Sequence, residues 1–402
     1  MKLQDINFKK YITYLLIAYA FAFPVSKAAT NLFEILAILL WVIEGNWKEK
    51  FNLYKKDLLS LTIATLIGFS LLSILWHGNA ELTLRYVAKY RHLLIIFVFY
   101  TSFDTKYSKH VISAFLLGIF ISELVSYGIF FEIIHYKNIS PTDPTPFMSH
   151  MTYSTVLAFA ISVLIVQLIF EKNLKFKIFY ILFTLSATIN LFINGGKTGQ
   201  IIFIVLIFIT TLSSVQHKMK ALLSSLLLLS ITFFIAFTYS PNFHTRSIQL
   251  YSGLHDMVYH NNYDVNGGRR VALSIIGLKT FVNNPILGTG ISYHMKNAQS
   301  YATQEKLNIK NIIGYSDYHS AFLTISVQLG IIGLFISLLM IYALFSFSIQ
   351  KKEYKILSVL FATAFVMFSF THNTFHTMNP MVFFALFAGF FNSLIQKRET
   401  HQ

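Results

Sequence analysis

The chain has 402 residues, of which 55% are hydrophobic and 12% are charged, and its mean hydropathy is +0.58. These charged side chains are too few to cover the surface of a soluble protein of this length. The composition therefore indicates a multi-span membrane protein. The net charge of +15 does not point to nucleic acid, because we expect the excess lysine and arginine to lie in short loops beside the membrane. The absence of cysteine excludes disulfides, thiolate metal sites and cysteine nucleophiles.

The apolar runs predict an all-α integral membrane protein with about twelve transmembrane helices. The predicted spans are 11–25, 30–44, 58–76, 87–103, 111–130, 150–170, 178–194, 199–215, 221–239, 320–349, 356–372 and 381–396. The first run resembles a signal-peptide core, but no small-residue cleavage site follows it cleanly, and we interpret it as a retained helix. We expect residues 1–402 to form a single polytopic membrane domain.

The placement of lysine and arginine predicts the orientation of these helices. More than half of the 32 basic residues lie in seven short segments, namely 1–10, 45–57, 104–110, 171–177, 216–220, 350–355 and 397–402. Because basic loops stay in the cytoplasm, we expect these segments and both termini to be cytoplasmic. The alternate connections then face outward, and 240–319 is the one long enough to hold structure of its own.

Within this outward loop the sequence predicts one amphipathic helix. Val271, Ile275, Leu278 and Val282 recur at helical spacing, so we expect Arg269 to Val282 to lie on the outer membrane surface or to dip into it. The run Asn283-Asn284-Pro285 should end the helix, and Gly288-Thr289-Gly290 should make a sharp turn. The polar tract 296–316 is expected to be mobile.

Two groups of residues near this loop are candidates for chemistry. His319 precedes a long apolar run, and an imidazole at the outer surface can accept a proton from a hydroxyl at neutral pH. It could equally cap the helix at the interface. Arg269 and Arg270 point about 100° apart on a helix, so only one should face inward. An inward arginine would bind phosphate, and the alternative is an anchor to lipid headgroups.

Basic residues elsewhere offer two further anion sites. Gly195-Gly196-Lys197-Thr198-Gly199 is not a nucleotide-binding loop, because Leu191 stands where its first glycine would be. It could present backbone amides and one ammonium to an anion, or form a tight hairpin with a snorkelling lysine. Arg85, Lys89 and His92 are expected on one helical face, to bind an anionic lipid head or to anchor the helix.

For the other polar residues, a structural role explains the sequence at least as well as a functional one. Glu34 and Glu123 lie within spans, and either a functional role or helix-to-helix hydrogen bonding explains them. His372 and His376 have the spacing i, i+4 but no further ligand nearby, so no metal site is predicted. The long loop lacks an acidic pair and a nucleophile elbow. We therefore expect an enzyme of this sequence to work without metal, cofactor or covalent intermediate.

The long loop and the residues in and after it resemble those of the bacterial O-antigen ligases. This family belongs to a superfamily that also contains O-antigen polymerases and protein O-oligosaccharyltransferases. The resemblance rests on one large loop late in a multi-span chain and on two local motifs. The motif residues are Arg270, Pro285, Gly288, Gly290, His319, Ser320, Gly330 and Gly333. The helical layout covers nearly the whole chain, whereas the local motifs cover about a sixth of it.

The resemblance implies a GT-C-like glycosyltransferase of the bacterial inner membrane, with 240–319 as a large periplasmic loop. It implies transfer of a glycan from undecaprenyl diphosphate to a sugar hydroxyl of lipid A-core, without ATP or metal and with inversion. His319 and Arg270 would be catalytic. Residues expected to bind substrate are Lys197, Arg269, Arg85, Lys89 and Ser320. Lys197 occupies a position where the family usually has arginine, and an ammonium does not bind phosphate bidentately.

Two alternatives remain open from the sequence. One is a polymerase or protein-glycosylating enzyme of the same superfamily, which differs in its acceptor. The other is a transporter or flippase, which would be expected to carry charged or broken helices at mid-membrane depth.

Overall fold

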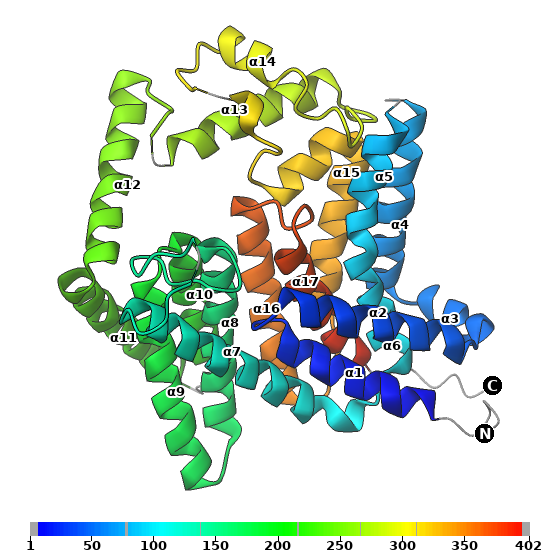
Figure 1. Ribbon diagram of the computed structural model, residues 1–402, viewed down its shortest axis with the longest axis vertical. Coiled ribbons are helices and arrows are strands. Elements are labelled where there is room, and N and C mark those ends of the chain that lie inside the picture. The colour runs from blue at the N-terminus through cyan, green and yellow to red at the C-terminus, as the bar shows by residue number, and fades with distance from the viewer. Residues whose placement is uncertain are drawn as a thin grey trace.

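The computed structural model describes residues 7–76, 79–136, 138–214, 217–265, 267–310 and 312–395. Within these ranges the chain is helical, with no β-strand beyond an isolated bridge between Asn262 and Asn308. The all-α membrane class is therefore confirmed. Figure 1 shows α13 (Gly268–Asn283) and α14 (Ala298–Gln304) at one end of the molecule.

Helices occupy every predicted span. From the N-terminus to residue 130 they are α1 (Phe8–Ala22), α2 (Lys27–Glu44), α3 (Trp47–Tyr54), α4 (Leu58–Leu72), η2 (Ser73–Leu75), α5 (Ala80–Val87), η3 (Ala88–Leu93), α6 (Leu94–Ser102), η4 (Thr105–Tyr107) and α7 (Ser108–Phe130). The others are α8 (His150–Phe170), α9 (Leu174–Ile193), α10 (Lys197–Ser214), α11 (Lys218–Tyr239), α12 (Pro241–His260), α13, α14, η5 (Ile312–Gly314), α15 (Ala321–Phe345), α16 (Lys352–Thr371) and α17 (Met378–Ser393). In Figure 1, α1, α2 and α7 run across the direction of α4, α9 and α15.

Fewer helices are long enough to cross a membrane than the twelve spans predicted from the sequence. Eight helices among the described residues are long and apolar enough to cross a membrane, or up to nine if the bent pair α2 and α3 forms one span. That pair bends by 112°, and α17 is shorter than the others. A multi-pass protein is thus supported, whereas twelve crossings and the periplasmic side of 240–319 stay predictions.

Close packing of α8 against α10 forms the centre of the molecule. From Thr152 to Leu164 every side chain of α8 is buried. A Cβ added at Gly196 or Gly199 would collide with Ser154 on α8, so these two glycines allow the helix backbones to approach. On another side Phe159 packs edge-to-face with Phe387 of α17, with the ring centroids 4.7 Å apart.

The segment 240–319 has more structure than its sequence predicted. The helix α12 fills its first part, and the tract 296–316, expected to be polar and mobile, contains α14 and η5. These elements pack on α13 and on the start of α15 around a hydrophobic cluster of their own. The buried members of this cluster are Leu273, Ile276, Ala298, Ala302, Ile312, Tyr318 and Val327. A few apolar side chains scattered through polar sequence are enough to order the tract once they meet one face of α13.

The predicted helix in this loop is confirmed as α13, and it packs on the protein through a second apolar stripe that the sequence analysis did not single out. The core-facing side chains include Leu273, Ile276 and Thr280, while Leu278 and Val282 are more than half exposed. The helix has two apolar stripes, and the sequence does not show which one packs inward. Inward packing of the Leu273 stripe leaves the predicted stripe free to meet lipid.

The helix α15, predicted as an unbroken span, is broken at Gly330, where φ is 64° and ψ is −150°. The break frees backbone groups, and the turn after α13 satisfies them. Thr289 N–H donates to the Val327 carbonyl at 2.9 Å, and Gly290 N–H donates to the Gln328 carbonyl at 2.9 Å. A third bond runs from Ile331 N–H to the Pro285 carbonyl at 2.8 Å. The two family motifs therefore form a single backbone joint, which fixes α13 relative to α15.

Candidate functional site

Lys197 begins α10, directly after the turn formed by Gly195 and Gly196. Its ammonium nitrogen is buried and has no hydrogen-bond partner within the described ranges. The amides of the turn do not form the predicted anion site, because Gly195 N–H donates to Asp143 and Gly196 N–H donates to the side chain of Asn194. The ammonium, and not the backbone, is therefore what the turn offers to an anion.

A second cation, Arg246, lies on the same turn and was not singled out in the sequence. The first turn of α12 is tied to the end of α9, since Asn242 Nδ2 donates to the Ile193 carbonyl at 3.0 Å. Arg246 follows Asn242 by four residues and so lies on the same helical face. Its Nη1 donates to the Gly195 carbonyl at 3.0 Å. The signal available in the sequence was this i, i+4 spacing, but its target was not visible there.

A third cation, Arg270, enters from α13. Its Nη2 contacts the thioether of Met151 at 3.0 Å, and a thioether is only a weak acceptor. Burial lowers the pKa of this guanidinium from its ordinary value, although arginine remains charged. The neighbouring Arg269 points away, is exposed, and pairs with Asp264 at 2.8 Å. As predicted, only one of the two arginines faces inward.

The three cations form a row that leads toward His319. Lys197 lies within electrostatic range of both Arg246 and Arg270, and Arg270 lies within range of His319. Lys197 and Arg270 have no ion pair with a described residue, whereas Arg246 also lies within electrostatic range of Asp143. Unpaired charges in partly buried positions are costly unless an anion joins them. The arrangement is therefore suited to a ligand with at least two negative charges.

His319 lies just before α15, which begins at Ala321 after the N-cap residue Ser320. Its backbone has a positive φ of 52°, and its N–H donates to Asp317 Oδ1 at 2.7 Å. Burial lowers the pKa of the His319 imidazole below its ordinary value, Asp317 opposes this shift, and Arg270 adds to it. The imidazole is therefore neutral at pH 7 and able to accept a proton.

Two other histidines border this position. The His372 carbonyl accepts the N–H of Ala321 at 3.2 Å, and His372 lies within electrostatic range of His319 and Arg270. The Nε2 of His376 lies 3.5 Å from the ammonium of Lys89. Their buried Nδ1 atoms have no partner in the part of the chain that the structure describes. Lys89 thus joins the His319 side of the site.

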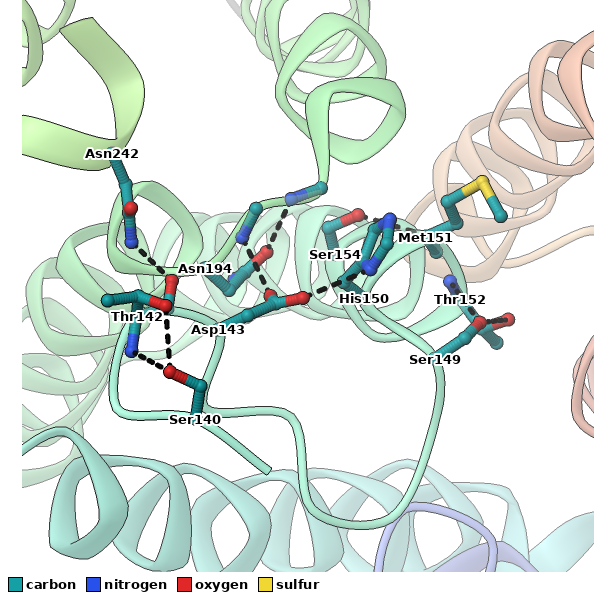
Figure 2. A network of polar contacts seen from close by, with 12 residues as sticks. Ser140, Thr142, Asp143, Ser149, His150, Met151, Thr152, Ser154, Asn194 and Asn242 are labelled. Atoms are coloured by element: carbon teal, nitrogen blue, oxygen red, sulfur yellow. Dashed lines mark hydrogen bonds and ion pairs between the residues drawn. The ribbon is translucent and has the colours of Figure 1, made fainter. Parts of the chain in front are cut away.

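Figure 2 shows a polar network beside the cation row that the sequence analysis missed. Asp143 accepts from Gly195 N–H at 3.0 Å and pairs with His150 Nδ1 at 3.1 Å. Burial alone would raise the pKa of Asp143, but the hydrogen bonds from His150 and Gly195 lower it below its ordinary value. The ionised carboxylate holds the turn that carries Lys197.

The predicted common face of Arg85, Lys89 and His92 is wrong. Arg85 is exposed and pairs with Glu81 at 2.6 Å, whereas His92 is buried against Glu34 at 2.6 Å. The α-helix gives way to the 3₁₀ helix η3 at Ala88, which changes the angular spacing of side chains. Of the three, Lys89 is the one near His376.

The remaining polar candidates serve the fold. The hydroxyl of Ser320 accepts the N–H of Leu323 at 3.4 Å as the N-cap of α15. Glu34 pairs with His92, and Glu123 accepts a hydrogen bond from Ser186. Both contacts join two helices, as expected if these carboxyl groups serve helix-to-helix hydrogen bonding. On α12 the side chains of His255, Asp256 and His260 bring ligand atoms within 4.8 Å of one another, but two of the three are exposed.

Comparison with known proteins identifies one family. A family model described as O-antigen ligase matches residues 179–338. No match to a curated protein was found. The matched range contains Lys197, Arg246, Arg270 and His319, which are the row of cations and the imidazole at its end. The match supports the resemblance seen in the sequence: residues 179–338 are similar to the O-antigen ligase family.

Proposed function

We propose that the protein is an O-antigen ligase that transfers a glycan from a polyprenyl diphosphate, undecaprenyl diphosphate in the family, to a sugar hydroxyl of lipid A-core at the periplasmic face of the inner membrane. The feature that supports this proposal is the group of three cations, Lys197, Arg246 and Arg270, next to His319, whose pKa is lowered by burial. A lipid diphosphate is an anion that such a row fits, and a sugar hydroxyl is a group that a neutral imidazole can deprotonate.

The proposed reaction is a direct displacement. The acceptor oxygen forms a bond to the anomeric carbon, and its proton passes to His319. The bond between that carbon and the phosphate oxygen breaks, and the electron pair leaves with the lipid diphosphate. Arg270 and Lys197 stabilise the charge that develops on the leaving group. A single displacement of this kind inverts the anomeric centre.

The acceptor side of the site is supported by a different observation. Lys89 and His376 contact each other and both lie within electrostatic range of Asp317, two residues before His319. A cation there suits an acceptor that is itself anionic, as lipid A-core is. Polymerase and protein-glycosylating activities use the same donor chemistry and differ in this acceptor.

The test is transfer of a labelled glycan from a polyprenyl diphosphate by purified enzyme. With lipid A-core as acceptor, wild type should give product, and His319→Ala should reduce the rate at least 100-fold, since general base catalysis contributes about 10² to 10⁴. The variant should keep wild-type thermal stability, because the imidazole makes no strong side-chain contact in the described structure. Wild-type transfer to glycan or protein, but not to lipid A-core, would reject the ligase assignment.

A further inference from the structure

We infer that Arg246 is the third cation of the donor site and that it binds the phosphate that carries the prenyl chain, while Arg270 binds the phosphate joined to the sugar. This inference rests on the proposed function and goes beyond it by giving the donor lipid an orientation. It also gives α12 a role in substrate binding that its sequence did not suggest.

The first argument is the hydrogen bonding of Arg246. A guanidinium has five N–H groups, and the bond from Nη1 to the Gly195 carbonyl is the one formed with a described residue. A Cβ added at Gly195 would lie 2.5 Å from both Cζ and Nη2 of Arg246. The glycine thus lets the guanidinium lie flat against the turn that carries Lys197. The remaining N–H groups are free to bind an anion there.

The second argument is the order of charges along the row. Lys197 is within electrostatic range of Arg246 on one side and of Arg270 on the other. His319 is within range of Arg270. The sugar carbon must lie beside His319 for the proposed reaction, so the sugar-side phosphate is the one near Arg270. The prenyl-side phosphate then falls toward Arg246.

The third argument is an apolar cavity at the Arg246 end of the row. It has a volume of about 630 Å³ and is lined by α9, α10 and α11. Ser240 and Asn242 line one part of it, and Asn242 is one helical turn before Arg246. Phe192, Ile207, Leu228 and Ile235 line other parts. The cavity reaches Ile193 and Asn242, which adjoin the turn that Arg246 contacts, so a prenyl chain attached to a phosphate at Arg246 would have this apolar cavity beside it.

A different role for Arg246 is to cap the end of α9 through the Gly195 carbonyl. The two roles predict different results for Arg246→Gln, because glutamine keeps an N–H donor for the carbonyl and removes the charge. A matched control is Arg269→Gln, which removes one positive charge from the first turn of α13 at an exposed position.

The experiment measures binding of a short prenyl diphosphate and the corresponding prenyl monophosphate to purified full-length protein. We expect Arg246→Gln to weaken binding of both probes about tenfold or more, the size of one lost charge-assisted contact. Arg270→Gln should weaken binding of the diphosphate to the same extent, and it should change the affinity for the monophosphate less than about threefold. Arg269→Gln should change neither.

Three outcomes would overturn the inference. Unchanged binding of both probes by Arg246→Gln would leave Arg246 as a cap. If Arg246→Gln weakened binding of the diphosphate alone, and Arg270→Gln weakened binding of the monophosphate, the donor lipid would lie in the opposite orientation. If Arg246→Gln is unstable, Arg246→Lys decides, because lysine keeps the charge but not the planar fork. It should weaken binding of both probes, and a stable lysine variant with wild-type binding of both would leave Arg246 as a cap. Wild-type protein that binds neither probe would instead refute the proposed function as well.

Discussion

Gly288→Ala should separate the helix that carries Arg270 from the helix that follows His319. Gly288 has a φ of +69°, and a Cβ there would lie 2.5 Å from Gln328 C and from Gly330 N. An L-residue in this conformation costs about 1 to 2 kcal/mol. The obstructing atoms are backbone, so the turn after α13 must move away from the break in α15.

The movement would cost backbone hydrogen bonds as well. The three bonds made by Thr289, Gly290 and Ile331 N–H groups join the two motifs. Each contributes about 0.5 to 1.5 kcal/mol. Loss of all three with the backbone strain therefore amounts to about 2.5 to 6.5 kcal/mol, enough to change how α13 is held without unfolding the helices around α8.

Hydrogen exchange of purified protein measures this effect directly. The amides of Thr289, Gly290 and Ile331 should exchange faster in Gly288→Ala, and donor binding should weaken because Arg270 is no longer fixed. Gly68→Ala is the control, since a Cβ at Gly68 meets nothing within 4 Å. Wild-type exchange at these three amides in Gly288→Ala would refute the joint as the element that positions α13.

The other predictions concern charge, pH and topology. Lys197→Arg should keep transfer activity, whereas Lys197→Ala and Arg270→Ala should each lose at least tenfold in transfer rate, because one charge-assisted contact contributes about 1.5 to 3 kcal/mol; wild-type rates in both alanine variants would make these residues membrane anchors. Because burial lowers the pKa of His319 and the neutral form is required, the transfer rate should stay full as pH falls to about 6.5 and drop only below it. Asp317→Asn, which removes the charge that raises this pKa, should move the drop to lower pH; a drop above pH 7 in wild type would contradict a neutral His319. A reporter that works only in the periplasm should be active when fused near Lys296. Activity of a reporter that works only in the cytoplasm, fused at the same place, would reject the predicted orientation.

The sequence predicted the helices and the inward arginine because both depend on local spacing. Apolar runs long enough to span a membrane formed helices at all the predicted positions, and two consecutive residues on a helix must point in different directions. Local spacing failed for the segment from Arg85 to His92, where the helix changes type, and for α13 it did not show which second stripe packs on the protein. Periodicity does not state which neighbour an element will meet.

The missed residues all depend on contacts between distant parts of the chain. Arg246 reaches Gly195 because α12 is tied to the end of α9, and Asp143 reaches the same turn from the loop before α8. Neither residue lies in a motif of its own. The break at Gly330 was missed for a similar reason, since the residues that make it tolerable lie some forty positions earlier, in the turn after α13.

The lysine at position 197 is best understood together with Arg246. An ammonium is a point charge on a flexible stem and cannot grip a phosphate with two parallel bonds, as arginine does. In this chain a guanidinium from α12 lies against the same turn, held there by the Gly195 carbonyl and by the lack of a Cβ at Gly195. The turn thus presents both a central charge and a planar fork, although the two come from different helices. Under the proposed function, the planar fork that Lys197 lacks would come from Arg246, which only the tertiary structure brings beside it.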